Sequence, residues 1–294
     1  MPSSRERLFL SLLQSCRDDD RVVGVIDYGS GGHGRADEWP DIDAAVFLQD
    51  GAYDAFVGDW RAWAARLGDL LFAYVGRFGH WAMFEGDDMP LRVDLDFIRE
   101  SEIQQITAGP LAPTSVEQMV LYDGTGGILT SIIRSIVGRV DQPDNLPRAF
   151  HAVLGDFWYF SLFCCSKLGR GETWVARIVF HSQVLDNLAL LLRLEAGAVD
   201  RWEGAHAAIG LENSISDSRR IELEACTPKP GREGLLVALE SSCALAATVS
   251  RDVALRLGVE FPERLVAEVS AAIARMRAKE ESPIRTGALE SDSR

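Results

Sequence analysis

Residues 21–48 decide the fold, and their sequence is RVVGVIDYGSGGHGRADEWPDIDAAVFL. The apolar, β-branched run 21–28 predicts a strand, and the cluster of glycines after it predicts the turn at which that strand ends. Asp43–Leu48 predicts a second strand. The segment is therefore a strand, a glycine-rich turn and a returning strand that begins next to two aspartates.

The flanking sequence predicts two parts, one of alternating strands and helices and one of helices alone. A helix is predicted at 52–67, where aromatic residues recur at helical spacing, and further strands at 70–75, 81–84 and 91–98. Strands that alternate with helices indicate an α/β layer. After residue 108 the periodicity is helical, with helices predicted at 115–121, 127–137, 147–168, 172–195, 216–226, 231–257 and 262–279.

We therefore expect an α+β protein with two domains and a tail. Residues 1–108 would form the α/β domain and residues 109–280 an all-α helical bundle. Pro147–Leu168 is apolar almost all round and should be a central helix of that bundle. Residues 281–294 are polar and are expected to be disordered.

Composition restricts the partners. The chain has 294 residues, of which 47% are hydrophobic and 25% charged, as in ordinary soluble globular proteins. Its formal net charge of −14 would repel a phosphate backbone, so we expect no nucleic-acid partner. A metal held by carboxylates could still bind a small triphosphate, because local charge decides that contact.

The cysteines and apolar runs indicate a cytoplasmic protein. The five cysteines form no CxxC pair and are odd in number, which favours buried, reduced thiols. The apolar run 8–13 is too short for a secretory signal and fits an amphipathic helix better. No stretch approaches the roughly 20 consecutive apolar residues of a membrane span, so no membrane partner is expected.

The chemistry is concentrated in Gly29-Ser30 and in Asp41 and Asp43. Side chains alternate along a strand, so the two aspartates point to the same side, where they repel each other unless a cation lies between them. Mg²⁺ takes oxygen ligands and leaves positions open for substrate phosphates. The Gly-Ser turn offers N–H groups and a hydroxyl to phosphate, and Arg35 in the same loop is a candidate phosphate contact. This pattern predicts a metal–triphosphate site.

A third acid is expected on the strand 91–98. Its apolar residues face one way, and Arg92, Asp94 and Asp96 face the other. A simply solvated face is the alternative interpretation of this strand. Two-metal phosphoryl transfer, however, needs a further carboxylate to hold the second ion or to deprotonate the attacking hydroxyl, and alternation alone does not choose between Asp94 and Asp96.

Residues 28–47 resemble the nucleotidyltransferase superfamily with the polymerase-beta-like fold, whose pattern is a Gly-Ser turn followed by Asp-x-Asp/Glu. The chain is most similar to the lincosamide and aminoglycoside antibiotic nucleotidyltransferases. Three further segments carry that narrower resemblance: LRVDLDF at 91–97, VLYDGTG at 120–126 and RGE at 170–172.

The resemblance implies AMP transfer from ATP, with two Mg²⁺ ions, to a hydroxyl of a small and cationic acceptor, an antibiotic. It implies that Gly29 and Ser30 hold the triphosphate, that Asp41, Asp43 and Asp94 bind metal, and that Asp94 is the general base. The helical domain would shape the acceptor pocket. The family often has Glu at its second and third acidic positions, where this chain has Asp.

Two other functions remain as alternatives, and a homodimer is left open. One is a nucleotidyltransferase of toxin–antitoxin type that modifies a protein side chain, although those domains usually end where the helical part of this chain begins. The other is a non-catalytic nucleotide-binding module. A dead site need not keep all three acids, which favours the enzyme.

Overall fold

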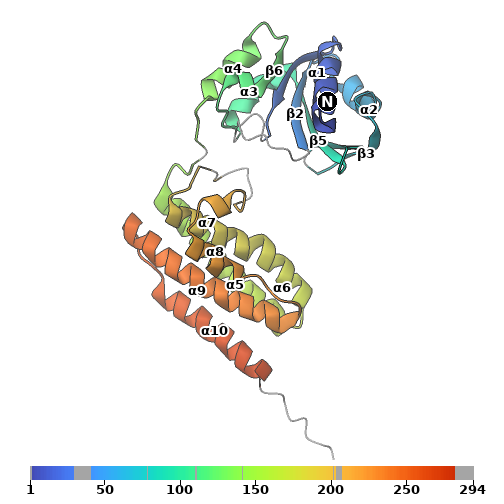
Figure 1. The fold of residues 1–294 in the computed structure, drawn as a ribbon. Coiled ribbons are helices and arrows are strands. Elements are labelled where there is room, and N and C mark those ends of the chain that lie inside the picture. The colour runs from blue at the N-terminus through green and yellow to red at the C-terminus, as the bar shows by residue number, and fades with distance from the viewer. Residues whose placement is uncertain are drawn as a thin grey trace, which may run out of the picture. The chain divides into compact units, whose positions relative to one another are not determined.

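The computed structural model describes residues 2–29, 41–77, 79–109, 111–140, 142–200, 202 and 207–281. The chain divides into two compact units, Met1–Asp141 and Gln142–Arg294 (Figure 1). Two of the candidate site residues, Ser30 and Arg35, lie outside the described residues. So does nearly all of the expected tail, 282–294.

Unit 1 is built on a six-stranded sheet in the order β3-β4-β5-β2-β1-β6. The central strands β2 and β5 are parallel, and the other neighbouring pairs are antiparallel. The strands are β1 (Val22–Asp27), β2 (Asp41–Leu48), β3 (Leu70–Val75), β4 (His80–Phe84), β5 (Leu91–Arg99) and β6 (Val120–Asp123). A parallel pair needs a long crossover connection, and residues 49–90 supply it with a helix and the β3–β4 hairpin.

One face of the sheet is covered by α1 (Ser4–Arg17) and α2 (Tyr53–Ala64). Leu12, Phe56 and Trp60 are almost fully buried against alternate residues of the strands, among them Val93 and Leu95. Apolar residues at every second position of β5 therefore bury one of its faces. Its acidic residues are left on the opposite face.

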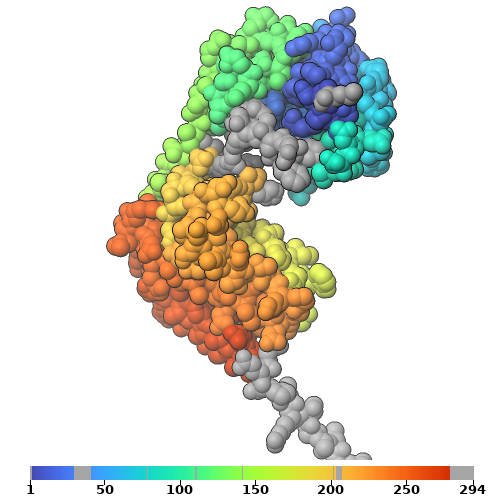
Figure 2. Space-filling view, viewed as in Figure 1, coloured from blue at the N-terminus to red at the C-terminus, as the bar shows by residue number. Residues whose placement is uncertain are grey.

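The opposite face is covered over β1, β2 and β6 by a 3-10 helical segment, η1 (Glu100–Ala108), and by α3 (Val116–Met119) and α4 (Ile128–Ile136). Phe47 and Ile133 are completely buried in this second cluster. In the space-filling view, α2 and the edge strand β3 (light blue to cyan) lie at one margin of the unit (Figure 2).

The sheet-containing unit extends beyond residue 108, where we expected the α/β part to end. The difference lies in 115–121, for which we predicted a single helix. Only Val116–Met119 is helical, and the next four residues form β6, which pairs with β1. The apolar residues of this segment suit both structures, and pairing with β1 selects the strand.

Unit 2 is helical, as expected. Its helices are α5 (Leu146–Gly169), α6 (Thr173–Val179), α7 (Leu185–Ala196), α8 (Asp217–Glu224), α9 (Gly231–Leu257) and α10 (Glu263–Glu281). A π-helical segment, η2 (Phe180–Val184), joins α6 to α7, and a 3-10 turn, η3 (Leu211–Asn213), precedes α8. The prediction that Pro147–Leu168 lies in a buried central helix is confirmed, since nine residues of α5 are buried.

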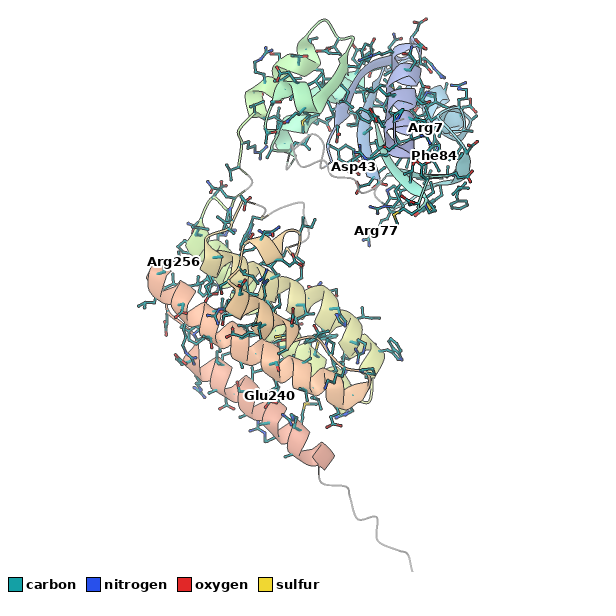
Figure 3. All side chains as sticks on the ribbon, viewed as in Figure 1. Arg7, Asp43, Arg77, Phe84, Glu240 and Arg256 are labelled. Carbon is teal, nitrogen blue, oxygen red and sulfur yellow. The ribbon has the colours of Figure 1, made fainter. Side chains whose placement is uncertain are left out.

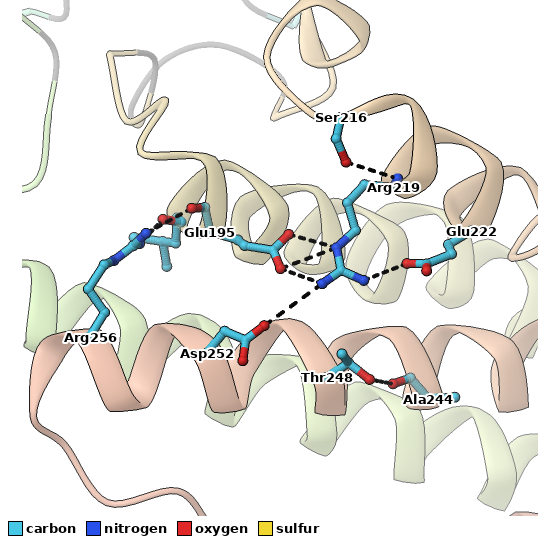
Figure 4. Close-up of polar contacts among 9 residues, drawn as sticks. Glu195, Ser216, Arg219, Glu222, Ala244, Thr248, Asp252 and Arg256 are labelled. Carbon is cyan, nitrogen blue, oxygen red and sulfur yellow. Dashed lines mark hydrogen bonds and ion pairs between the residues drawn. The ribbon is translucent and has the colours of Figure 1, made fainter.

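Polar contacts join three helices of unit 2 around Arg219 of α8 (Figure 4). Its guanidinium contacts the carboxylate of Glu195 on α7 at 2.5 Å and that of Glu222 on α8 at 2.6 Å, and it lies 3.9 Å from Asp252 on α9. Arg256 of α9 donates to backbone carbonyls at the end of α7. Similarly, Glu240 on α9 pairs with Arg277 on α10.

Two helices of this unit are long and apolar enough, by length and composition, to cross a membrane: Thr173–Ala196 and Gly231–Leu257, each with a mean hydropathy of 1.3. We expected no such stretch, because no run in the sequence approaches roughly 20 consecutive apolar residues. Of the most apolar stretch of each helix, 39% is buried inside the unit for Thr173–Ala196 and 61% for Gly231–Leu257. The core helices of soluble proteins meet the same length and composition criterion.

Candidate active site

Asp43 and Asp94 lie directly opposite each other on the parallel strands β2 and β5. Residues paired across neighbouring strands point to the same face, so both carboxylates lie on the face opposite to α1 and α2. Figure 3 shows Asp43 near the end of the sheet where β2 begins. The sheet register therefore brings together two of the acids that the sequence analysis selected.

The turn after β1 closes over Asp43. The backbone N–H of Tyr28 donates to the Asp43 carbonyl at 3.1 Å, and that of Gly29 donates to the Asp27 carboxylate at 2.9 Å. A Cβ atom at position 29 would lie 2.7 Å from Cγ of Asp43. Only glycine permits this approach, because any side chain would displace the carboxylate.

Asp41 stands apart from this pair in its contacts. Its register partner on β5 is Arg92, and the Arg92 guanidinium lies 3.2 Å from the Asp41 carboxylate. Its backbone carbonyl accepts a hydrogen bond from Arg5 of α1. Both charged side chains of the Asp41–Arg92 pair are partly exposed, so water screens the pair and the attraction is modest.

Burial and like charge raise the pKa values of Asp43 and Asp94. The pKa of Asp43 rises to about 7, through burial first and then through the negative charges of Asp94, Asp41 and Asp27. Burial also raises the pKa of Asp94, opposed by the nearby positive charge of Arg92 and reinforced by the negative charge of Asp41. Clustered carboxylates with raised pKa values mark functional sites more often than ordinary surfaces.

Asp96 lies one pleat further along β5 and pairs with Ala45 rather than with an acid. Burial and the charge of Asp94 raise its pKa. A Cβ atom on Gly79 would lie 3.0 Å from an Asp96 carboxylate oxygen, so the β3–β4 hairpin passes close to it. The register makes Asp94, and not Asp96, the direct neighbour of Asp43.

Divalent-cation binding fits this donor set. Two carboxylates in register, both with pKa values raised by burial and by neighbouring negative charge, supply the oxygen ligands and the excess negative charge that Mg²⁺ prefers. Within the described residues, no three His, Cys, Asp or Glu side chains are already spaced to hold one ion. The carboxylate of the third acid, Asp41, lies against Arg92 instead.

Sequence reasoning missed Asp27 and the aromatic residues of β3 and β4. Asp27 is 7% exposed and shapes the turn through Gly29. Its signal was its position two residues before the glycine, where an aspartate commonly accepts the N–H two residues on. The aromatic residues carried no such signal, because β3 and β4 have large apolar residues on both faces.

A mixed sheet with a glycine turn after β1 and acids in register on β2 and β5, followed by a helical unit, is the arrangement that the resemblance to nucleotidyltransferases led us to expect. The family comparison is more specific. The streptomycin adenylyltransferase family model matches residues 3–276, and the chain belongs to this family. The protein is thus a nucleotidyltransferase related to antibiotic adenylyltransferases.

Two solved structures are similar to the chain at low sequence identity. An aminoglycoside 6-adenyltransferase from Bacillus subtilis is 17% identical, with a TM-score of 0.42, covering 96% of this chain and all of that one. A nucleotidyltransferase-like protein from Exiguobacterium sibiricum is 12% identical, with a TM-score of 0.36, covering 90% of this chain and 89% of that one. A search of curated proteins finds no match.

Proposed function

We propose that the protein transfers AMP from ATP to a hydroxyl of an aminoglycoside antibiotic in a Mg²⁺-dependent reaction. The observation that carries this proposal is the direct register of Asp43 with Asp94, beside a turn in which Gly29 lies so close to the Asp43 carboxylate that a side chain there would displace it. The family description supplies the acceptor class, because family members are described as streptomycin adenylyltransferases. A lincosamide is the alternative small-molecule acceptor.

Each site residue has a proposed role. Gly29 and Ser30, with Arg35, would bind the triphosphate, and Asp41, Asp43 and Asp94 would hold two Mg²⁺ ions. Bound Mg²⁺ would neutralise negative charge on the phosphates and carboxylates. The carboxylate of Asp94 would accept the proton of the attacking hydroxyl as the new bond to the α-phosphorus forms and pyrophosphate leaves.

Arg92 would control the third metal ligand. Its guanidinium holds the carboxylate of Asp41, so Asp41 would exchange this contact for the ion when Mg-ATP binds. The pair is exposed enough for the exchange to cost little. Arg92 would then be released close to the site, as a cation able to contact phosphate.

The acidic surface supports a cationic small molecule and disfavours nucleic acid, since the net charge is −14. We propose that the helical unit, residues 142–281, contributes to the acceptor pocket and that the protein acts in the cytoplasm.

A transfer assay tests the proposal. Purified protein is incubated with ATP, MgCl₂ and either streptomycin or lincomycin, and the products are analysed by mass spectrometry. The expected product is streptomycin with a mass increase of one AMP, together with pyrophosphate, and none should form with EDTA. Modification of lincomycin alone would reassign the acceptor, and absence of any AMP adduct with either compound would contradict the proposal.

A further inference from the structure

Large side chains of β3 and β4 continue the row of carboxylates across the sheet. Asp94 is paired with Trp81 of β4, and Trp81 is paired with Tyr74 of β3. In the next row, Met83 of β4 is paired with Phe72 of β3. We call these four residues, Phe72, Tyr74, Trp81 and Met83, the aromatic strip.

The strip lies on the same face as the catalytic candidates. Ala82 and Phe84, which alternate with Trp81 and Met83, are buried under α1 and α2 on the other face. The rings of Tyr74 and Trp81 meet edge-on at 5.3 Å, and those of Phe72 and Tyr74 lie 5.5 Å apart. Phe72 is 57% exposed, and the other three side chains are half-buried. An apolar surface therefore borders Asp94 directly.

A glycine in the hairpin turn fixes the position of the Trp81 ring. A Cβ atom on Gly76 would lie 2.8 Å from Cη2 of Trp81, so the indole rests over a position that has no side chain. The turn itself is closed by a hydrogen bond from the Gly76 N–H to the Gly79 carbonyl at 2.8 Å. The indole is thus supported by the hairpin turn and by Tyr74.

The order of strands places the strip and the phosphate turn on opposite sides of the carboxylates. Gly29 follows β1, Asp43 and Asp94 lie on β2 and β5, and the strip lies on β4 and β3. In phosphoryl transfer, the attacking and leaving oxygens lie roughly in line on opposite sides of the phosphorus. If pyrophosphate leaves on the side of the β1 turn, the acceptor hydroxyl must approach from the side of β4.

We infer that the aromatic strip is the floor of the acceptor subsite and binds the sugar rings and cationic groups of the antibiotic. The inference rests on the proposed function and adds the residues that recognise the acceptor. Aromatic rings attract cations and cover the apolar faces of sugars, and the neighbouring carboxylates of Asp94 and Asp96 complement positive charge. A nucleobase could also stack on such rings. The base, however, is part of ATP, the molecule that supplies the pyrophosphate leaving group.

Binding measurements without catalysis test the inference. Streptomycin is titrated by calorimetry into wild-type protein and the variants Trp81→Ala, Trp81→Phe and Tyr74→Ala, without nucleotide or metal. Mg-ATP is titrated in parallel, without acceptor. We expect Trp81→Ala to weaken streptomycin binding about tenfold, within the range of a cation–π contact in a desolvated site. Trp81→Phe should keep most of the affinity.

Val75→Ala is the matched control, because Val75 lies on the same edge strand, is paired with His80 on the α2 side, and is 56% exposed. It should leave both affinities unchanged. Thermal unfolding of each variant checks that the hairpin remains folded. Tyr74→Ala tests the strip independently if Trp81→Ala unfolds the hairpin.

The outcomes separate this inference from the proposed function. If wild-type protein binds streptomycin and both alanine variants bind it equally well, the inference is wrong and the proposed function stands. If the variants lose affinity for Mg-ATP and not for streptomycin, the strip holds the base, which also overturns the inference. If wild-type protein does not bind streptomycin, the proposed acceptor is wrong, and the inference fails with it.

Discussion

At the scale of single residues, Asp43 is both the most constrained acid of the site and the one whose charge is least favoured. Burial and three neighbouring acids raise its pKa to about 7, and the Gly29 backbone packs closely against its side chain. Such a side chain is maintained at a cost to the folded state, as functional residues often are.

Asp43→Asn should therefore reduce AMP transfer to less than a tenth of the wild-type rate, while stability is unchanged or higher. The amide has nearly the same shape but lacks the charge that holds a cation, and its neutrality removes repulsion from Asp94 and Asp41. Turnover with Mg-ATP and streptomycin, and the melting temperature of metal-free protein, measure the two effects. A variant that retains more than a tenth of the wild-type turnover would contradict the proposed role of Asp43 as a metal ligand.

Asp94→Asn and Asp96→Asn form a matched pair on one strand face. Asp94→Asn should lower turnover by roughly 10²-fold or more, the lower end of general-base catalysis, whereas Asp96→Asn should cost far less. The structural reason is register, since Asp94 is opposite Asp43 and Asp96 is opposite Ala45. Turnover rates at saturating Mg-ATP and acceptor compare the two variants. A larger loss of turnover from Asp96→Asn would show that Asp96, and not Asp94, is the third acid of the site.

The sequence was enough to select Asp94 and Asp96 as candidates, but not to decide which of them lies opposite Asp43. Alternation along β5 puts Asp94 and Asp96 on one face, which is a local property. Which of them faces Asp43 depends on the parallel pairing of β2 with β5 across about forty intervening residues, including the β3–β4 hairpin. The same long-range pairing brings Trp81 next to Asp94, and no local pattern indicates it.

At the scale of elements, the connection from β6 to α4 is organised around the side chain of Asp123. The carboxylate of Asp123 accepts hydrogen bonds from the backbone N–H and the hydroxyl of both Thr125 and Thr130. Burial would raise its pKa, but these four bonds outweigh it and lower the pKa to about 2. The carboxylate thus accepts a hydrogen bond from the first turn of α4, where backbone N–H groups have no acceptor within the helix.

Asp123→Ala should lower the free energy of unfolding at pH 7 by about 2 kcal/mol, the upper end for loss of a helix cap. Because the folded-state pKa is below the unfolded value of about 3.9, this contribution is complete above pH 4 and is lost as pH falls toward 2. Urea unfolding of wild type and variant from pH 7 to pH 3 measures the difference, which should narrow only below pH 4.

Asp88→Ala is the control for this pH series, because Asp88 is exposed in the loop between β4 and β5. It should have little effect on stability at any pH. A difference between Asp123→Ala and wild type that stays constant down to pH 3 would show that the ionised carboxylate is not what stabilises the connection.

Most elements could be predicted because their patterns are local, and β6 could not because its pattern is ambiguous. Long apolar helices such as α5 and the alternating strand β5 carry strong periodicity. Residues 115–121 suit a helix equally well, and only the free edge of β1 draws residues 120–123 into the sheet. Tertiary pairing overrides local propensity there.

At the scale of the whole molecule, the two units have separate hydrophobic cores. Among the described residues, the helical unit has one cluster, and the sheet unit has one on each face of its sheet. A domain with its own core can in principle fold alone. The cluster beneath α4 shows that the sheet unit includes α4, since Leu129, Ile132 and Ile133 of α4 pack with Phe47 and Ile26.

A fragment of residues 1–141 should therefore fold cooperatively and bind Mg-ATP, whereas a fragment of residues 1–108 should not fold. The shorter fragment lacks β6 and α4 and exposes one face of the sheet to water, which is unfavourable for every apolar side chain on it. Circular dichroism during thermal unfolding, with calorimetry for Mg-ATP, compares the two. A stable shorter fragment would restore residue 108 as the boundary.

The buried cysteines make the molecule easy to label. All five are free and buried, and burial raises the pKa of each thiol, to about 12 for Cys16 and about 11 for Cys165. Thiol-directed dyes react with the thiolate, so native cysteines should give almost no background. Single cysteines introduced at Met89 in unit 1 and at Leu255 in unit 2, both exposed, would accept a donor–acceptor dye pair. Energy transfer between the dyes would then follow the distance between the two units as Mg-ATP and antibiotic bind.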